Sequence, residues 1–156
     1  MAAIDLLALK GALPPGGRLL GLDVGSKTIG LAISDSALTV ASPLATLTRG
    51  KFAADMARLA ALRAERGVGG LVLGLPLALD GREGPRTQSV RQFAANLLRE
   101  MDLPLAFWDE RLSTVAVERP LKEAGMSHRR RGRVVDALAA AYILQGALDR
   151  LARAGA

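Results

Sequence analysis

The feature that most constrains the fold of this chain is an uninterrupted apolar run near its middle. Residues 67–77 read GVGGLVLGLPL, without one charged side chain. Such a run is typical of a parallel strand covered by helices on both faces, because neither face then meets water. Helical periodicity on either side agrees with this, since apolar residues recur every three or four positions in 52–65 and in 86–101. The run therefore predicts an α/β architecture.

The remaining segments predict the other elements of one sheet. Gly25 is expected to be the turn residue of an antiparallel hairpin, and Pro43 is expected to interrupt a short third strand. The expected strands lie at 18–24, 29–34, within 38–48 and at 104–110, and the further helices at 114–124 and 133–153. This order predicts a mixed five-stranded sheet, an antiparallel three-strand meander plus two parallel strands, with helices on both faces. Its functional crevice should lie at the carboxyl ends of the parallel strands.

Length and composition indicate one domain that folds without covalent staples. The 156 residues are divided into an N-terminal extension, 1–17, with room for one short helical turn, and a domain at 18–153. The extension lacks a basic n-region, and no segment approaches a membrane span, so we expect a cytoplasmic protein without a membrane partner. Cysteine is absent and His128 is the only histidine, which excludes thiolate chemistry and histidine-rich metal sites.

Carboxylates occupy three places that folding alone does not favour. Asp23 ends the first strand, Asp109 and Glu110 end the last strand, and Asp136 is the only charged residue in the apolar segment 134–147. Each has a structural explanation: a turn acceptor for Asp23, a solvent-exposed strand exit paired with Arg111, and a helix-dipole partner for Asp136. The topology would nevertheless bring them together, and carboxylates in one place repel one another unless a cation joins them. Without Cys or His, Mg²⁺ or Mn²⁺ is the expected cofactor.

The charge balance indicates a polyanionic partner. The net charge is +6, from 21 basic and 15 acidic residues, and only five side chains are aromatic, so contact with a phosphate backbone is favoured over base stacking. Gly74, at the end of the apolar run, is expected to admit a phosphate backbone, with close packing as the alternative. For the arginines taken singly, solvated surface charge is the alternative. The candidate nucleic-acid-binding residues are Lys27, Arg82, Arg86, Arg129, Arg130, Arg131 and Arg133.

Four segments of the chain resemble the YqgF/RuvX family, also called Holliday junction resolvases or pre-ribosomal-RNA nucleases, of the ribonuclease H-like superfamily. The resemblance covers residues 18–150 in family order. Its segments are LDVGSKTIGLAISDS at 22–36, VLGLPLALDGREGPRTQ at 72–88, WDERLST at 108–114 and RRRGRVVDALAAAYILQ at 129–145. The combination is specific, whereas the first segment alone also opens actin-like and sugar-kinase ATPases.

The resemblance implies a ribonuclease H-like fold and metal-dependent cleavage of nucleic acid. Its catalytic, metal-binding acids carry over to Asp23, Glu110 and Asp136, whereas Asp109 is not assigned because adjacent strand residues face opposite ways. The family also implies processing of the 5′ end of pre-16S rRNA, and the older label implies a resolvase-like fold. RNA, branched DNA and single-stranded DNA all stay open as substrates, and so does a homodimer.

The chain departs from the family pattern at two informative positions. Thr28 stands where the hairpin usually has arginine, and Pro120 lies inside the expected helix after the DER segment. Neither departure is expected to affect the three acids. Two other readings remain: a nucleic-acid-binding factor that has lost catalysis, acting in ribosome maturation or DNA repair, and an actin-like ATPase, which would need a second such domain.

Overall fold

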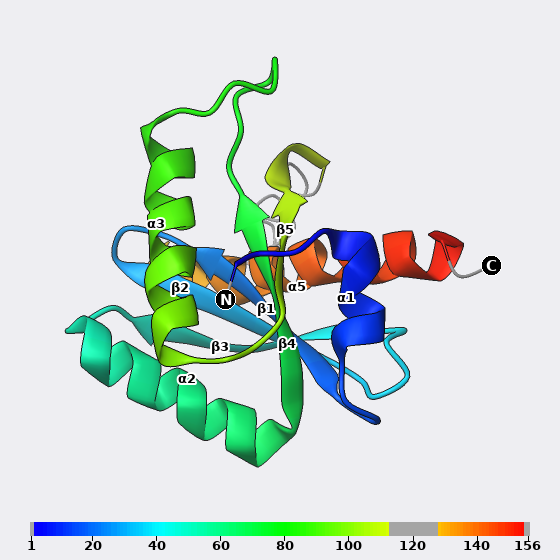
Figure 1. Cartoon of the computed structure of the whole chain (residues 1–156). Helices are drawn as coiled ribbons and strands as arrows, with labels where there is room; N and C mark the ends of the chain where they lie inside the picture. Colours follow the sequence, from blue (N-terminus) through cyan, green and yellow to red (C-terminus); the bar gives the residue numbers. More distant parts are fainter. Residues whose placement is uncertain (1, 113–127, 155–156) are drawn as a thin grey trace.

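The computed structural model describes residues 2–112 and 128–154, with the side chains of the last helix described from residue 134. Its strands form one sheet in the order β3-β2-β1-β4-β5 (Figure 1). β1 pairs antiparallel with β2, and β2 with β3, whereas β4 lies parallel to both β1 and β5. The predicted mixed five-stranded sheet is confirmed. The strands are β1 (Arg18–Val24), β2 (Thr28–Ser34), β3 (Ala41–Thr48), β4 (Val68–Leu75) and β5 (Leu105–Asp109).

Helices cover both faces of this sheet. The helices are α1 (Leu6–Ala12), α2 (Phe52–Arg66), α3 (Pro85–Glu100) and α5 (His128–Ala154). Strand alternation sorts the apolar side chains into two clusters. Leu20, Leu22 and Val24 of β1 join the cluster of α2 and α3, whereas Leu19 joins the cluster of α1 and α5. Asp23 therefore lies on the α5 side of β1, between two residues that face α3.

Three elements differ from the sequence prediction. β3 runs through Pro43 without interruption, because β3 is an edge strand and the missing N–H falls at a register shift opposite Leu31 and Ala32. The last helix begins at His128 instead of residue 133. β5 ends at Asp109, and Glu110 opens a single 3₁₀ turn, η1 (Glu110–Leu112). The expected helix at 114–124 lies outside the described residues.

The N-terminal residues contact the rest of the sheet and its helices. α1 spans seven residues and buries Leu9 completely among the side chains on the α5 side. The Ile4 N–H donates a hydrogen bond to the Leu105 carbonyl of β5 at 2.8 Å. Across residues 2–112 and 128–154, none of the helices has the length and apolar character needed to cross a membrane.

Candidate active site

Asp23 and Glu110 lie at the same edge of the sheet, the one formed by the carboxyl ends of its parallel strands. This is because β1 and β5 both run parallel to β4, which lies between them. Asp23 is the penultimate residue of β1, and Glu110 directly follows β5. Gly74 of β4 makes room for the Glu110 side chain, since a Cβ at this position would come within 2.5 Å of Glu110 Oε1 and of Ile143 Cδ1. Close packing against Glu110 and α5, the alternative to the expected phosphate contact, is enough to explain this glycine.

The carboxyl groups of Asp23 and Glu110 are hydrogen-bonded to each other. Burial raises the pKa of Glu110 from 4.5 to about 8, and the charge and hydrogen bond of Asp23 contribute to the same shift. Burial also raises the pKa of Asp23; its hydrogen bond with Glu110 opposes that rise, and the charge of Asp136 adds to it. At neutral pH the protonated Glu110 carboxyl therefore donates to the Asp23 carboxylate, and the pair keeps one proton.

Asp136 approaches the same edge from α5. Thr28 Oγ1, at the start of β2, donates a hydrogen bond to Asp136 Oδ2 at 2.8 Å. α5 packs directly on β2 at Gly30, where a Cβ would overlap the Asp136 carbonyl oxygen. Because α5 begins at His128, Asp136 lies in its third turn, where the helix dipole is weak. Packing at Gly30 and the Thr28 hydrogen bond, rather than the helix end, thus hold Asp136 in place.

The contacts support the purely structural explanation for Asp109 but not the one for Asp23. The turn after β1 closes through a 2.8 Å hydrogen bond from the Gly25 N–H to the Thr28 carbonyl, so Asp23 is not needed as its acceptor. Asp109, by contrast, does mark a strand exit: its carboxylate accepts hydrogen bonds from the Arg111 side chain at 2.5–3.0 Å. The hydrogen bond from Arg111 lowers the pKa of Asp109, which stays ionised. Asp109 therefore belongs to an ion pair and Glu110 to the carboxyl pair.

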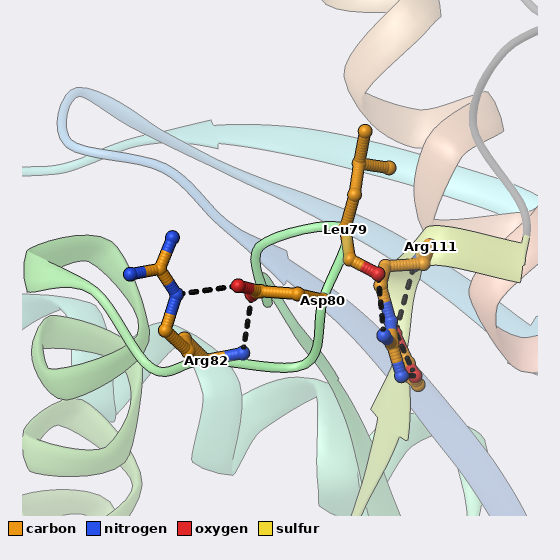
Figure 2. Close-up of polar contacts among 5 residues, drawn as sticks. Leu79, Asp80, Arg82 and Arg111 are labelled. Carbon is orange, nitrogen blue, oxygen red and sulfur yellow. Dashed lines mark hydrogen bonds and ion pairs between the residues drawn. The ribbon is translucent and has the colours of Figure 1, made fainter.

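Arg111 also connects the strand exit to the loop that follows β4. Its Nη1 donates to the Leu79 carbonyl at 3.1 Å, and in the same loop Arg82 forms an ion pair with Asp80 at 2.6 Å (Figure 2). The Leu79 side chain is 94% exposed and points away from the loop (Figure 2). Arg82 is thus the one candidate phosphate ligand whose charge a neighbouring acid already balances, among the candidates with described side chains.

The acids suit a divalent cation in their chemistry. Over the described part of the chain, no three His, Asp or Glu side chains gather closely enough to enclose an ion. Carboxylate oxygens are nevertheless the donors that Mg²⁺ and Mn²⁺ prefer, and a carboxyl pair that retains a proton at neutral pH is a place where a cation can replace that proton. Oδ1 of Asp136 accepts no hydrogen bond from any described residue, and so it remains available as a further oxygen ligand for a cation.

A pocket of about 470 Å³, the hairpin pocket, opens beside this edge of the sheet. It is formed by residues 24–28 of the β1–β2 hairpin and by Arg86, Ser89 and Val90 of α3. It brings together two predicted nucleic-acid-binding residues, Lys27 and Arg86, which are 59 positions apart in sequence. The positive charge of Arg86 also lowers the pKa of both Asp23 and Glu110, which places it near the carboxyl pair.

Sequence reasoning missed some members of this region and leaves others untested. Thr28, a departure from the family pattern, was expected not to affect the three acids; that was wrong, because its hydroxyl donates to Asp136. Ser26 and Ser89 carried no signal beyond their position near basic residues. The backbone of Arg129, Arg130, Arg131 and Arg133 lies in the first turns of α5, but their side chains fall outside the described residues. Their role in binding stays a prediction.

Comparison with known proteins assigns the family. Residues 17–150 match the family model described as RuvX, Holliday junction resolvase. A relative from Paramagnetospirillum magneticum is 60% identical over 149 residues, covering 96% of this chain and 94% of the relative. One from Cereibacter sphaeroides is 59% identical over 140 residues, covering 90% and 88%. Both carry the name "Putative pre-16S rRNA nuclease".

Among solved structures, Thermus thermophilus RuvC in complex with a Holliday junction substrate has a similar fold. It superposes with a TM-score of 0.55 at 16% identity, covering 89% of this chain and 96% of RuvC. This likeness supports the ribonuclease H-like fold that the resemblance implied, independently of close sequence similarity. The family match spans β1 to α5 and includes all three acids. The chain belongs to the RuvX family of Holliday junction resolvases.

Proposed function

We propose that this chain is a divalent-metal-dependent nuclease that hydrolyses phosphodiester bonds, and that its substrate in the cytoplasm is the 5′ end of pre-16S rRNA. The observation that carries the proposal is the hydrogen-bonded pair of Asp23 and Glu110 at the carboxyl ends of two parallel strands, with Asp136 close by. The family match supports nuclease chemistry, and the names of the relatives support precursor ribosomal RNA as the substrate.

In this proposal Asp23, Glu110 and Asp136 hold Mg²⁺ or Mn²⁺. When bound, the cation supplies Lewis-acid activation of water and neutralises charge on the phosphate that is cleaved. Asp23 and Glu110 would hold the cation as two carboxylates and would give up their shared proton to solvent, because a nearby cation favours the ionised form of both. Thr28 holds one Asp136 oxygen by a hydrogen bond, which would fix the orientation of that carboxylate toward the cation.

The same proposal assigns the basic residues to the phosphate backbone. Lys27 and Arg86 line the hairpin pocket next to the acids, and they would bind phosphates flanking the cleaved bond. Arg82 contributes less, because Asp80 neutralises it. The arginines at the start of α5 would contact the substrate farther along. These residues are Arg129, Arg130, Arg131 and Arg133.

Cleavage assays with the intact chain test the proposal. Labelled pre-16S rRNA fragments, single-stranded RNA, single-stranded DNA and a four-way DNA junction are incubated with Mg²⁺, with Mn²⁺ and with a chelator. We expect cleavage of the precursor RNA only when metal is present, and none by Asp23→Asn. The matched control is Asp5→Asn, because Asp5 is exposed and its side chain caps no helix.

Four outcomes would count against the proposal. Cleavage in the presence of chelator would show that the reaction needs no metal. Full activity of Asp23→Asn would show that Asp23 is not a catalytic residue. Tight binding of RNA without cleavage in either metal would instead identify the chain as a nucleic-acid-binding factor. Preferential cleavage of the four-way junction would identify branched DNA, rather than precursor RNA, as the substrate.

A further inference from the structure

The hairpin pocket has the composition of a site for a phosphorylated ligand. Lys27 and Arg86 supply two positive charges, Ser26, Thr28 and Ser89 supply hydroxyl groups, and no carboxylate lines the pocket. Neither Lys27 nor Arg86 lies within 4.0 Å of an acid oxygen among the described residues. Lys27 and Arg86 therefore make no direct ion pair with a described acid, and two cations that face the same cavity favour an anion between them.

The walls of the pocket suit more than a free anion. Val24 and Val90, both buried, add apolar atoms to the lining beside the polar groups. The volume, about 470 Å³, falls in the range of small-molecule sites in proteins. A phosphate bound by the cations, with a sugar and base against the two valines, would use both kinds of wall.

The pocket is held open by contacts that do not involve a ligand. Arg49 contacts the hairpin at two points. Its Nη1 donates to the Gly25 carbonyl at 2.7 Å, and its backbone N–H donates to the Lys27 carbonyl at 2.8 Å. The Arg49 guanidinium lies 5.2 Å from the centre of the Phe93 ring on α3. The two sides of the pocket are therefore tied together, and a ligand enters a site that is already formed.

The pocket is continuous with the acids around the end of β1. Asp23 and Val24 are consecutive and face opposite sides of the sheet, so the carboxyl pair lies on one side of this strand end and the pocket on the other. Thr28 belongs to both, since it lines the pocket and donates to Asp136. Arg86 also belongs to both, because it lines the pocket and lies near the carboxyl pair.

From this arrangement we infer that the hairpin pocket binds one nucleotide of a single-stranded nucleic acid, next to the phosphodiester bond that the acids cleave. The inference rests on the proposed nuclease function and adds the strandedness of its substrate. A strand that crosses the end of β1 places one nucleotide in the pocket and the neighbouring phosphate at the carboxyl pair. A base-paired nucleotide would first have to unpair and unstack from its helix, which disfavours a duplex as the ligand.

Amide chemical shifts of the intact chain, recorded with chelator present, test this inference. The probes are uridine 5′-monophosphate, adenosine 5′-monophosphate and, as the control without phosphate, adenosine. Both monophosphates should shift the amides of residues 25–28 and 89, whereas adenosine should not. Ser89→Glu places a negative charge in the pocket at an exposed position and should weaken monophosphate binding about tenfold. Ala95→Glu puts the same charge on an exposed site of α3 outside the pocket and should leave binding unchanged.

A second pair of probes separates nucleic acid from free nucleotide. A short oligouridylate should shift the same amides at lower concentration than the monophosphate, and a blunt RNA duplex of the same length should not shift them. Shifts confined to other residues, equal binding by Ser89→Glu, tighter binding of the monophosphate than of the oligomer, or equal shifts with the duplex would each overturn the inference. These titrations need no turnover, so a chain that binds in the pocket but cleaves nothing would contradict only the nuclease proposal.

Discussion

Glu110 and Asp23 are the residues whose ionisation should change most between the folded and unfolded chain. Both acids have a raised pKa when folded, chiefly because they are buried, so folding favours the protonated form. Stability contributed in this way is complete below pH 4.5 and is lost as the pH rises toward about 8, the folded pKa of Glu110. The metal-free protein should therefore be less stable at pH 8 than at pH 5.

Glu110→Gln should remove most of this pH dependence. The glutamine amide can still donate to Asp23 but cannot ionise, so in chelator at pH 8 the variant should unfold at a higher urea concentration than the parent. The difference should be on the order of 1–3 kcal/mol, after allowance for solvent screening and coupling to Asp23. Urea midpoints at pH 5 and pH 8 measure it, with Glu65→Gln on the exposed side of α2 as the control. Parallel pH dependence in all three proteins would contradict the carboxyl pair.

Gly30 is required at its position for a different reason, which is contact rather than charge. Gly30→Ala would place a Cβ against the Asp136 carbonyl oxygen, a backbone atom that cannot move without moving α5. We expect a loss of about 1–3 kcal/mol or more in the free energy of unfolding. Gly11→Ala, in α1, meets no atom within 4 Å and should be neutral or stabilising by up to about 1 kcal/mol. Chemical denaturation of both variants decides the point, and equal stabilities would show that α5 does not pack on β2 as described.

At the scale of elements, β2 and α5 are coupled by one side-chain hydrogen bond across 108 positions of sequence. Thr28→Val keeps the shape and the strand preference of the residue but removes the donor to Asp136. We expect cleavage to slow by a larger factor than substrate affinity falls, because Asp136 loses its orientation whereas Lys27 and Arg86 keep their charges in the pocket. Thr28→Ser retains the hydroxyl and should restore most of the rate. Turnover and binding constants of the two variants test this, and equal turnover in both would assign Thr28 to folding alone.

The elements that sequence reasoning predicted well are those with a strong local pattern. Strand 18–24 and the helix after Gly84 carry clear apolar periodicity, and their predicted bounds agree with β1 and α3 to within one residue. The start of α5 was placed too late because residues 128–132 read HRRRG and carry no apolar pattern. α1 buries Leu9 against residues distant in sequence, a gain that the local sequence does not reveal.

The candidate site divides in the same way. The positions of Asp23 and Glu110 follow from strand ends that the sequence predicts, so their meeting was foreseeable. Three other features depend on tertiary contacts between distant elements. They are the hydrogen bond from Thr28 to Asp136, the packing of Gly74 against Glu110, and the placement of Lys27 and Arg86 in one pocket. No pattern along the chain reports such contacts. They required the structure.

For the whole molecule, the net charge of +6 predicts salt-dependent binding of nucleic acid. The ion pairs predict that Arg86 contributes more to this salt dependence than Arg82 does. Arg86→Ala should reduce the slope of log K against log salt by about 0.7–0.9, the value for one phosphate contact. Arg82→Ala should reduce it by less than half as much, because Arg82 is paired with Asp80. Fluorescence anisotropy with single-stranded RNA over a range of salt concentrations measures both slopes. Equal reductions would mean that the Asp80 ion pair opens freely when RNA binds.

The central claim is that Asp23, Glu110 and Asp136 form one cation site, and melting temperatures at pH 8 test it most directly. At a Mn²⁺ concentration 100 times its dissociation constant, linkage should stabilise the parent by about 2.7 kcal/mol and raise its Tm by roughly 5–10 °C over the value in chelator. Glu110→Gln should melt above the parent in chelator and respond less to Mn²⁺, while Glu65→Gln should follow the parent. A parent protein whose Tm does not change with Mn²⁺, together with a Glu110→Gln variant that melts below it in chelator, would contradict the claim.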